Sequence, residues 1–250
     1  LGDVYKRQAY AEYVGPVNVQ DIPGAGRGLV LTRDVEEGEL LLFCRAIGST
    51  YAKDPACDGL PLLRCNPDVG VTSTTTQVLA ATRCIHAILD RPELARIFLG
   101  LTAGPQTPCS RYVYEPYPLH KPAASDVLEP VYVSAHYVNN VLRFNAFGPA
   151  AVPAAEAGND PMSRSTMPHP LPAILNHACL PNVSSVFFGD FVTTRALHPL
   201  PKGTQIMHQY VQGELPYDAR QAQLSKHGFI CTCRLCALDV ADGVEPVSYT

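Results

Sequence analysis

The stretch Leu175–Asn182 reads LNHACLPN and is the part of the sequence that decides the fold. It brings an amide, an imidazole and a thiol together within four residues, just before a predicted β-hairpin. This combination of side chains is unusual in a plain strand or helix, so it indicates a functional segment. Taken alone, His177 and Cys179 fit a satisfied structural histidine and a buried thiol equally well.

A second informative stretch, HGFICTCRLC, spans residues 227–236 and carries Cys231, Cys233 and Cys236. Closely spaced thiolates can occupy three corners of a zinc tetrahedron, and a structural site needs a fourth ligand. His227 is near in sequence, and Cys179 is the other candidate if the fold brings it close. The alternative is an exposed tail of unligated cysteines, which we disfavour because clustered free thiols are prone to oxidation.

A glycine-rich turn, GAGRG, spans residues 24–28 between two short apolar runs. The pattern predicts a β-meander over residues 17–43, with glycines supplying the turn conformations. Glycine also lets a backbone approach a ligand closely. An isolated turn of this kind is at least as consistent with a bare β-turn.

Other elements follow from periodicity and turn signals. We expect irregular chain over 44–75, and then three helices: one after the capping-type run Thr74–Thr76, one from Pro92 and one over about 131–144. Further along the chain we expect a hairpin around Gly189-Asp190, a strand over 205–210, and a polar helix from Pro216 to about His227. Residues 148–170 are rich in Pro, Ala and Ser, so we expect a flexible loop there.

Composition excludes several classes of protein. A hydrophobic content of 46% with 17% charged residues is typical of a folded globular chain. A net charge of −4 offers no broad basic surface, so direct nucleic-acid binding is not expected. No apolar run approaches the roughly 20 residues that span a bilayer, so no membrane association is expected. Nine cysteines without a signal peptide favour metal ligation or free thiols and an intracellular location, nuclear or cytoplasmic.

The order of these segments resembles the SET-domain protein methyltransferases, and more narrowly their SMYD-like branch. The matching stretches are GAGRGLVLTRDVEEGELLL (24–42), NAFG (145–148), ILNHACLPN (174–182), RALHPLPKGTQIMHQYV (195–211) and HGFICTCRLC (227–236). The resemblance implies a mainly β protein with an α insert: a SET fold of small β-sheets, a helical insert and a zinc-bound post-SET segment.

The resemblance also implies roles for individual residues. Tyr210 is the catalytic residue, and Phe147 lines the channel for the substrate lysine. S-adenosyl-L-methionine is held by Gly26, Arg27, Gly28, Asn145, Asn176, His177 and Phe229. One structural zinc ion is held by Cys179, Cys231, Cys233 and Cys236, which favours Cys179 over His227 as the fourth ligand.

Domain boundaries follow from the same reasoning. Residues 1–8 (LGDVYKRQ) resemble translated adapter sequence from a sequencing library and are left out of the fold prediction. We expect the SET domain over 9–212, with an insert at about 44–130 and the loop at about 148–170, a post-SET segment over 213–240 and a tail over 241–250. The insert shows no zinc-like spacing of Cys and His, so we expect the MYND module of the SMYD branch to be absent, as in fungal SET proteins.

The expected function is S-adenosylmethionine-dependent methylation of a lysine in a protein substrate, histone or non-histone, by a monomer. One alternative is a catalytically silent SET module that acts in protein binding. A second is a zinc hydrolase with His177 as a ligand, but such a site needs a motif such as H-E-x-x-H, and the sequence has none.

Overall fold

The computed structural model describes residues 12–51, 54, 56, 63–66, 71–104, 133–148 and 165–243. The chain divides into two compact units. The first combines Leu1–Cys44 with Ile174–Thr250, and the second is the intervening Arg45–Ala173. In the described residues, no helix has both the length and the apolar character needed to cross a membrane.

One sheet of the first unit has the strand order β2-β3-β12-β9. Its strands are β2 (Val17–Ile22), β3 (Gly26–Leu31), β12 (Gln205–His208) and β9 (Asn176–His177). The β2–β3 turn contains Gly24 and Gly26, both in the left-handed region with φ of 73° and 67°, where a side chain would be strained. β9 pairs in parallel with β12, so the sheet brings the glycine turn and the Asn-His segment together.

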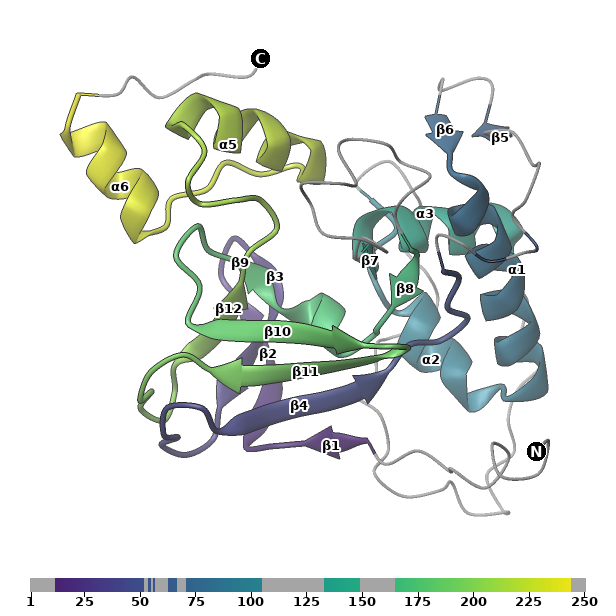
Figure 1. The fold of residues 1–250 in the computed structure, drawn as a ribbon, viewed down its shortest axis with the longest axis horizontal. Coiled ribbons are helices and arrows are strands. Elements are labelled where there is room, and N and C mark those ends of the chain that lie inside the picture. The colour runs from purple at the N-terminus through teal and green to yellow at the C-terminus, as the bar shows by residue number, and fades with distance from the viewer. Residues whose placement is uncertain are drawn as a thin grey trace. The chain divides into compact units, whose positions relative to one another are not determined.

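The other four-stranded sheet has the order β1-β4-β11-β10. It contains β1 (Tyr13–Val14), β4 (Leu40–Arg45), β10 (Val183–Phe188) and β11 (Phe191–Ala196). The predicted hairpin is confirmed, because β10 and β11 pair antiparallel across a turn in which Gly189 has a φ of 58°. Strand β10 also contacts β12, and the two sheets can be followed in Figure 1. The core of this unit includes the fully buried side chains of Leu29, Leu31, Leu41, Leu42 and Ile206.

The first unit ends in two helices, α5 (Tyr217–Leu224) and α6 (Arg234–Ala241). Pro216 precedes α5, a 3₁₀ turn over Ser225–His227 extends it, and Gly228 ends the turn in the left-handed conformation with a φ of 84°. The polar helix predicted between Pro216 and His227 is therefore confirmed. Helix α6 was not predicted, because its residues were interpreted only as a cysteine cluster and a tail.

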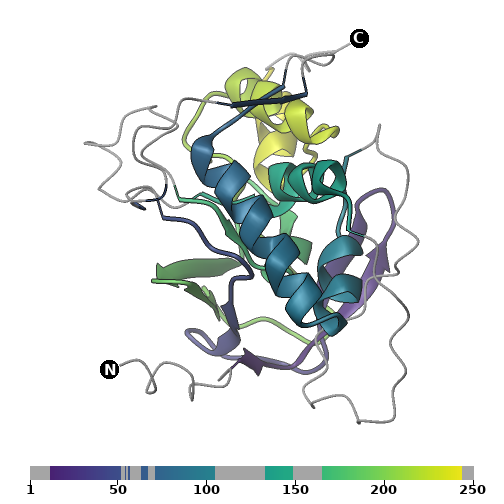
Figure 2. The ribbon, with the colours of Figure 1, turned by 90° about the vertical axis from the view of Figure 1, so that its right-hand side faces the viewer.

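In its described residues, the second unit contains three helices: α1 (Thr75–Asp90), α2 (Glu93–Leu99) and α3 (Ala135–Asn145). Thr74 caps α1 through a reciprocal capping box with Gln77, an arrangement that satisfies two backbone amides at once. Figure 2 shows α1 and α3 side by side, with α2 near one end of α1. All three helices were predicted. Helix α3 starts after its cap Ser134 rather than near residue 131, and residues 131–132 lie outside the described part.

Two expectations for the second unit are wrong in part. The segment 44–75 contains a two-stranded hairpin, β5 (Leu63–Asn66) with β6 (Val71–Ser73), whose strands are too short for a clear alternating pattern. The predicted flexible loop ends earlier than residue 170, because residues 165–170 are buried. There β8 (Met167–Pro168) pairs with β7 (Ala146–Phe147), and Thr166 bridges Thr50. At this end of the predicted loop, backbone pairing orders the chain despite its polar composition. Residues 149–164 lie outside the described residues.

Candidate functional site

Three of the predicted site segments meet at strand β9. Met207 and His208 of β12 lie opposite Asn176 and His177 in the parallel register. The Asn176 amide Nδ2 donates to the Arg27 carbonyl oxygen at 3.0 Å, a contact between residues 149 positions apart in the sequence. The structure thus brings the glycine turn, the Asn-His pair and the strand before Tyr210 together.

Gly28 is required by close packing and not by its backbone conformation. A Cβ built on it would lie 2.5 Å from Gln205 Nε2, 2.7 Å from Ile22 Cγ1 and 3.1 Å from Asn176 Nδ2. The same Gln205 Nε2 is buried and has no hydrogen-bond partner among the described residues. A buried donor without a partner is costly, so this spot suits a polar group of a ligand.

Tyr210 is anchored at both ends. Strand β12 ends at His208, so Tyr210 lies two residues beyond the strand and the predicted strand over 205–210 is too long. The Tyr210 backbone amide donates to His177 Nδ1 at 3.0 Å, and its hydroxyl donates to the Leu175 carbonyl oxygen at 2.8 Å. Burial raises the pKa of the Tyr210 phenol to about 12, so the group stays protonated at physiological pH.

Four rings surround Tyr210. The centroids of His208, His227 and His177 lie 5.0, 5.2 and 5.3 Å from its own centroid, and that of Phe229 lies 6.3 Å away. Burial, with a smaller contribution from His177, lowers the pKa of His208 to about 4, so this ring is neutral at pH 7. The structure thus unites three predicted site residues, Tyr210, His177 and Phe229, although they come from separate segments.

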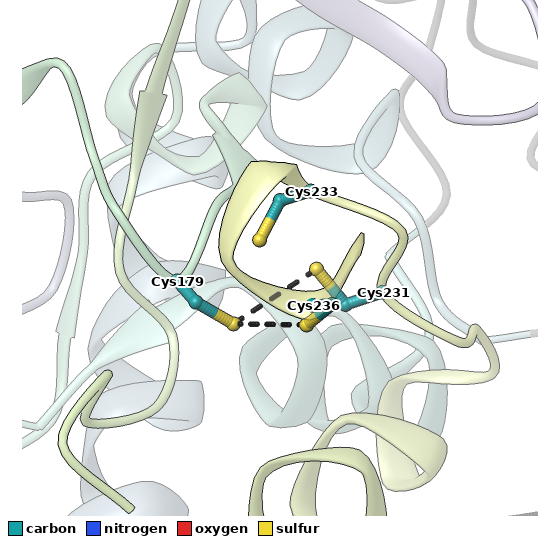
Figure 3. A group of neighbouring side chains, drawn as sticks. All are labelled: Cys179, Cys231, Cys233 and Cys236. Atoms are coloured by element: carbon teal, nitrogen blue, oxygen red, sulfur yellow. Dashed lines mark hydrogen bonds between the residues drawn. The ribbon is translucent and has the colours of Figure 1, made fainter. Parts of the chain in front are cut away.

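Cys179 joins the three cysteines of the C-terminal segment. The four sulfur atoms all lie within 4.8 Å of one another. Cys179 Sγ is 3.6 Å from Cys236 Sγ and 4.0 Å from Cys231 Sγ. Figure 3 shows Cys179 approaching the other three from the opposite side. A tetrahedron with Zn–S bonds of about 2.3 Å has edges of about 3.8 Å, so the spacing and the all-sulfur donor set fit zinc.

The electrostatics of the cluster favour metal binding too. A hydrogen bond from Cys231 lowers the pKa of the Cys233 thiol, and the same bond raises that of Cys231. The cluster therefore holds thiolate character at Cys233, and the thiolate is the form that binds zinc. His227 lies against the Tyr210 ring and is not among the four clustered residues.

Two residues of α5 support the cluster, and neither was predicted from the sequence. The Gln221 amide donates to the Cys231 carbonyl oxygen at 2.9 Å and accepts from the Cys231 amide at 2.9 Å. Arg220, which is 3% exposed, donates to Cys236 Sγ at 3.7 Å and forms an ion pair with Asp239. A buried guanidinium offsets negative charge on the thiolates. No local pattern marked these residues, because they act only once α5 folds over the cysteines.

Asn145 and Phe147 belong to the second unit. The Asn145 amide donates to the carbonyl oxygens of Thr102 and Val141 at 2.7 and 2.6 Å, so both of its hydrogens are used inside this unit. Phe147 packs edge-on against His169, with ring centroids 5.7 Å apart. It also lines a pocket of about 130 Å³ together with Thr76 and Thr166. The roles expected for both residues stay predictions.

The family model of the SET domain matches residues 26–211, which is most of the chain. The matched range runs from the glycine turn through the Asn-His segment to Tyr210. The chain belongs to the SET-domain family. The cysteines Cys231, Cys233 and Cys236 follow the matched range of this SET protein.

Curated relatives agree with this assignment. The SET protein is 36% identical over 75 residues to histone-lysine N-methyltransferase ATXR2 of Arabidopsis thaliana (28% of this chain, 16% of that protein) and 39% identical over 70 residues to protein-lysine N-methyltransferase SMYD4 of Mus musculus (27% and 9%). A protein named methyltransferase from Gibberella zeae is 22% identical over 239 residues (90% and 31%). The chain thus spans less than a third of the length of each of these relatives.

Solved structures give a further likeness. The structure of Rubisco LSMT bound to sinefungin and monomethyllysine aligns with 93% of this chain and 56% of that chain, with a TM-score of 0.41 and 14% identity.

Proposed function

We propose that this SET protein transfers a methyl group from S-adenosylmethionine to a lysine side chain of a protein substrate. The observation that carries the proposal is the double anchoring of Tyr210 beside His177 and Phe229. The names of the partial relatives, histone-lysine and protein-lysine N-methyltransferases, agree with it.

The cofactor proposal rests on the surroundings of strand β9. S-adenosylmethionine, when bound, supplies an electrophilic methyl group on a sulfonium. Gly28 packs so closely against Asn176 and Gln205 that a Cβ would crowd both side chains, and Gln205 offers a buried donor without a partner in the described part of the chain. Gly26, Arg27, Gly28, Asn176 and Phe229 are therefore the residues of this unit proposed to hold the cofactor.

Tyr210 is proposed to orient the reacting groups. Its hydroxyl proton is directed at the Leu175 carbonyl oxygen. Burial raises the pKa of its phenol to about 12, so the phenol remains protonated at physiological pH. It is therefore unsuited to remove a proton from a lysine ammonium. Methyl transfer needs in-line alignment of nitrogen, carbon and sulfur more than strong acid–base catalysis, and alignment alone can lower a barrier by about 7–11 kcal/mol. A rigid hydroxyl and ring beside the cofactor meet that need.

The zinc ion is proposed to be structural. Four thiolates fill a tetrahedral shell and leave no open position for water. Cys179 follows β9, whereas the other three cysteines belong to the C-terminal segment, so a shared ion would hold these two parts of the chain together. Phe229, two residues before Cys231, would thereby be held near Tyr210 and His177.

A Gly28→Ala substitution tests the cofactor site. The added methyl group must displace the amides of Gln205 or Asn176, so we expect the Kd for S-adenosylmethionine to rise about tenfold or more. The overpacking should also lower the free energy of unfolding by about 1–3 kcal/mol. Gly203→Ala is the control, because Gly203 has a φ of 84° and nothing within 4 Å of its added Cβ. It should cost about 1–2 kcal/mol of stability without affecting cofactor affinity. Calorimetric titration measures the cofactor affinity of both variants. Equal affinities in Gly28→Ala and Gly203→Ala would argue against the site.

The function itself is tested with isotopically labelled cofactor and a panel of proteins. We expect label to accumulate on lysine in at least one protein and cofactor binding to saturate at one site per chain. Saturable binding without transfer to any protein or to histones would favour the silent, protein-binding alternative. Failure to bind the cofactor would reject the proposal.

A further inference from the structure

We propose that the His177 imidazole is a positioning residue that links the Cys179 sulfur to Tyr210, so that the cysteine cluster sets the geometry of the tyrosine. The inference rests on the proposed function and extends it. The resemblance assigned His177 to cofactor binding. That role stays a prediction, and the structure directs both ring nitrogens of His177 into the protein.

The hydrogen bonds define the protonation of the ring. The Tyr210 backbone N–H donates to Nδ1 at 3.0 Å, and an amide nitrogen cannot accept, so Nδ1 carries no proton. A neutral imidazole then carries its proton on Nε2. That nitrogen lies 3.3 Å from Cys179 Sγ, so Nε2–H donates to the sulfur. The ring spans the distance between the cluster and the tyrosine.

The imidazole is also enclosed. His177 is 8% exposed, and its two ring nitrogens are both occupied by Tyr210 and Cys179. A ring in this state has no free nitrogen for a cofactor. The strand that carries it remains able to contribute through its backbone, and Asn176 through its side chain.

The segment after β12 wraps around Cys179 and reinforces the link. Gln209 Nε2 donates to the Cys179 carbonyl oxygen at 2.8 Å, and a Cβ on Gly213 would lie 2.5 Å from the same oxygen. The Ala178 amide donates to the His208 carbonyl oxygen at 3.0 Å. Cys179 and Tyr210 are therefore held by backbone contacts on both sides of the imidazole, and a shift of the sulfur is transmitted to the tyrosine.

The consequence concerns turnover as well as metal binding. With zinc bound, the Cys179 sulfur is fixed, and the His177 ring then holds the Tyr210 amide while the Leu175 carbonyl holds its hydroxyl. Partners that hydrogen-bond a metal ligand typically change metal affinity or activity about 10–100-fold when replaced. Loss of the ring should therefore affect both the zinc and the rate of methyl transfer.

Two substitutions separate the two hydrogen bonds of the ring. Asn places an amide oxygen near the position of Nδ1, so His177→Asn keeps an acceptor for Tyr210 and loses the donor to Cys179. Gln places an amide nitrogen near Nε2, so His177→Gln keeps that donor and loses the acceptor. We expect His177→Asn to raise the Kd for zinc about tenfold. We expect His177→Gln to retain zinc and to lower kcat about tenfold, while the KM for the cofactor changes less than about threefold.

The controls are His198→Asn and His198→Gln. His198 is exposed, and its ring hydrogen-bonds only the neighbouring Pro199 carbonyl among the described residues, so neither change should alter zinc affinity or kcat. The proposal is overturned if His177→Asn binds zinc like the wild type and His177→Gln turns over normally. It is also overturned if both variants lose only cofactor affinity, since the ring would then be a cofactor contact.

One measurement requires no substitution and no activity. Long-range proton–nitrogen NMR of the zinc-loaded wild type should show the His177 ring protonated on Nε2, with the Tyr210 amide protected from exchange. A proton on Nδ1 would contradict the link even if every variant failed to fold. If the wild type transferred no methyl group, the proposed function would fail, while the NMR and zinc measurements would still decide the role of His177.

Discussion

Tyr210→Phe should lower turnover about 100-fold, equivalent to about 2.7 kcal/mol of lost transition-state stabilisation. The change removes only the hydroxyl, which donates to the Leu175 carbonyl oxygen and is proposed to align the amine with the cofactor. The variant keeps the aromatic ring and its contacts with His177 and Phe229. It also keeps the hydrogen bond from the backbone amide of residue 210 to His177. Cofactor affinity should therefore change little. Leu175 is fully buried, so the carbonyl left without its donor should cost about 1–3 kcal/mol of stability.

Tyr137→Phe is the matched control for this prediction. The Tyr137 hydroxyl also donates to a backbone carbonyl, that of Leu99 at 3.1 Å, but the residue lies in α3 of the second unit. It should show a similar loss of stability with no change in turnover. Single-turnover kinetics and thermal unfolding separate the two effects. Near-normal turnover in Tyr210→Phe would contradict the catalytic assignment, and simple unfolding would support a core role.

Cys231→Ser should strongly weaken zinc binding. A hydroxyl is a much poorer zinc ligand than a thiolate, and losing one ligand of four should weaken binding by about 100-fold or more, since structural zinc contributes about 10–16 kcal/mol in small domains. Helix α5 packs on the cluster through Gln221 and Arg220, so the C-terminal helices should unfold at lower temperature. After dialysis against a zinc chelator, the zinc content measured by elemental analysis should fall from one per chain towards none, and circular dichroism should report the unfolding of the helices.

Cys84→Ser controls for the loss of a buried thiol. Cys84 is fully buried in α1, where its thiol donates to the Ile47 carbonyl oxygen at 3.0 Å, and a serine hydroxyl can do the same. This variant should keep one zinc per chain. Full zinc retention in Cys231→Ser, or equal loss in Cys84→Ser, would show that the four-cysteine cluster is not the metal site.

Local signals in the sequence predicted the elements that local interactions define. The Gly189-Asp190 pair predicted the β10–β11 hairpin, because glycine tolerates the positive φ of that turn. The capping-type run Thr74–Thr76 predicted the start of α1, which the structure caps at Thr74. The spacing of Cys231, Cys233 and Cys236 indicated a metal cluster, because three thiolates so close together can occupy neighbouring corners of one zinc tetrahedron.

Long-range pairing defined what the sequence alone did not. The pairing of β9 with β12 and the hydrogen bond from Tyr210 to His177 join residues about 30 positions apart, and no periodic pattern encodes either. Arg220 and Gln221 looked like ordinary residues of a polar helix, yet both are buried against the cysteines. The resemblance linked Asn145 to the cofactor, and this role stays a prediction; the sequence did not indicate that its amide hydrogens bond Thr102 and Val141. Such assignments depend on where a folded chain places each donor.

The most direct test of the central claim is mass spectrometry of a protein substrate incubated with S-adenosylmethionine and either the wild type or Tyr210→Phe. The proposed function predicts a mass increase of one or more methyl groups, located on a lysine side chain, with the wild type. It predicts that the same peptide stays essentially unmodified over the same time with Tyr210→Phe, although both proteins bind the cofactor. Cofactor binding by the wild type without methylation of any lysine, or equal methylation by both proteins, would contradict it.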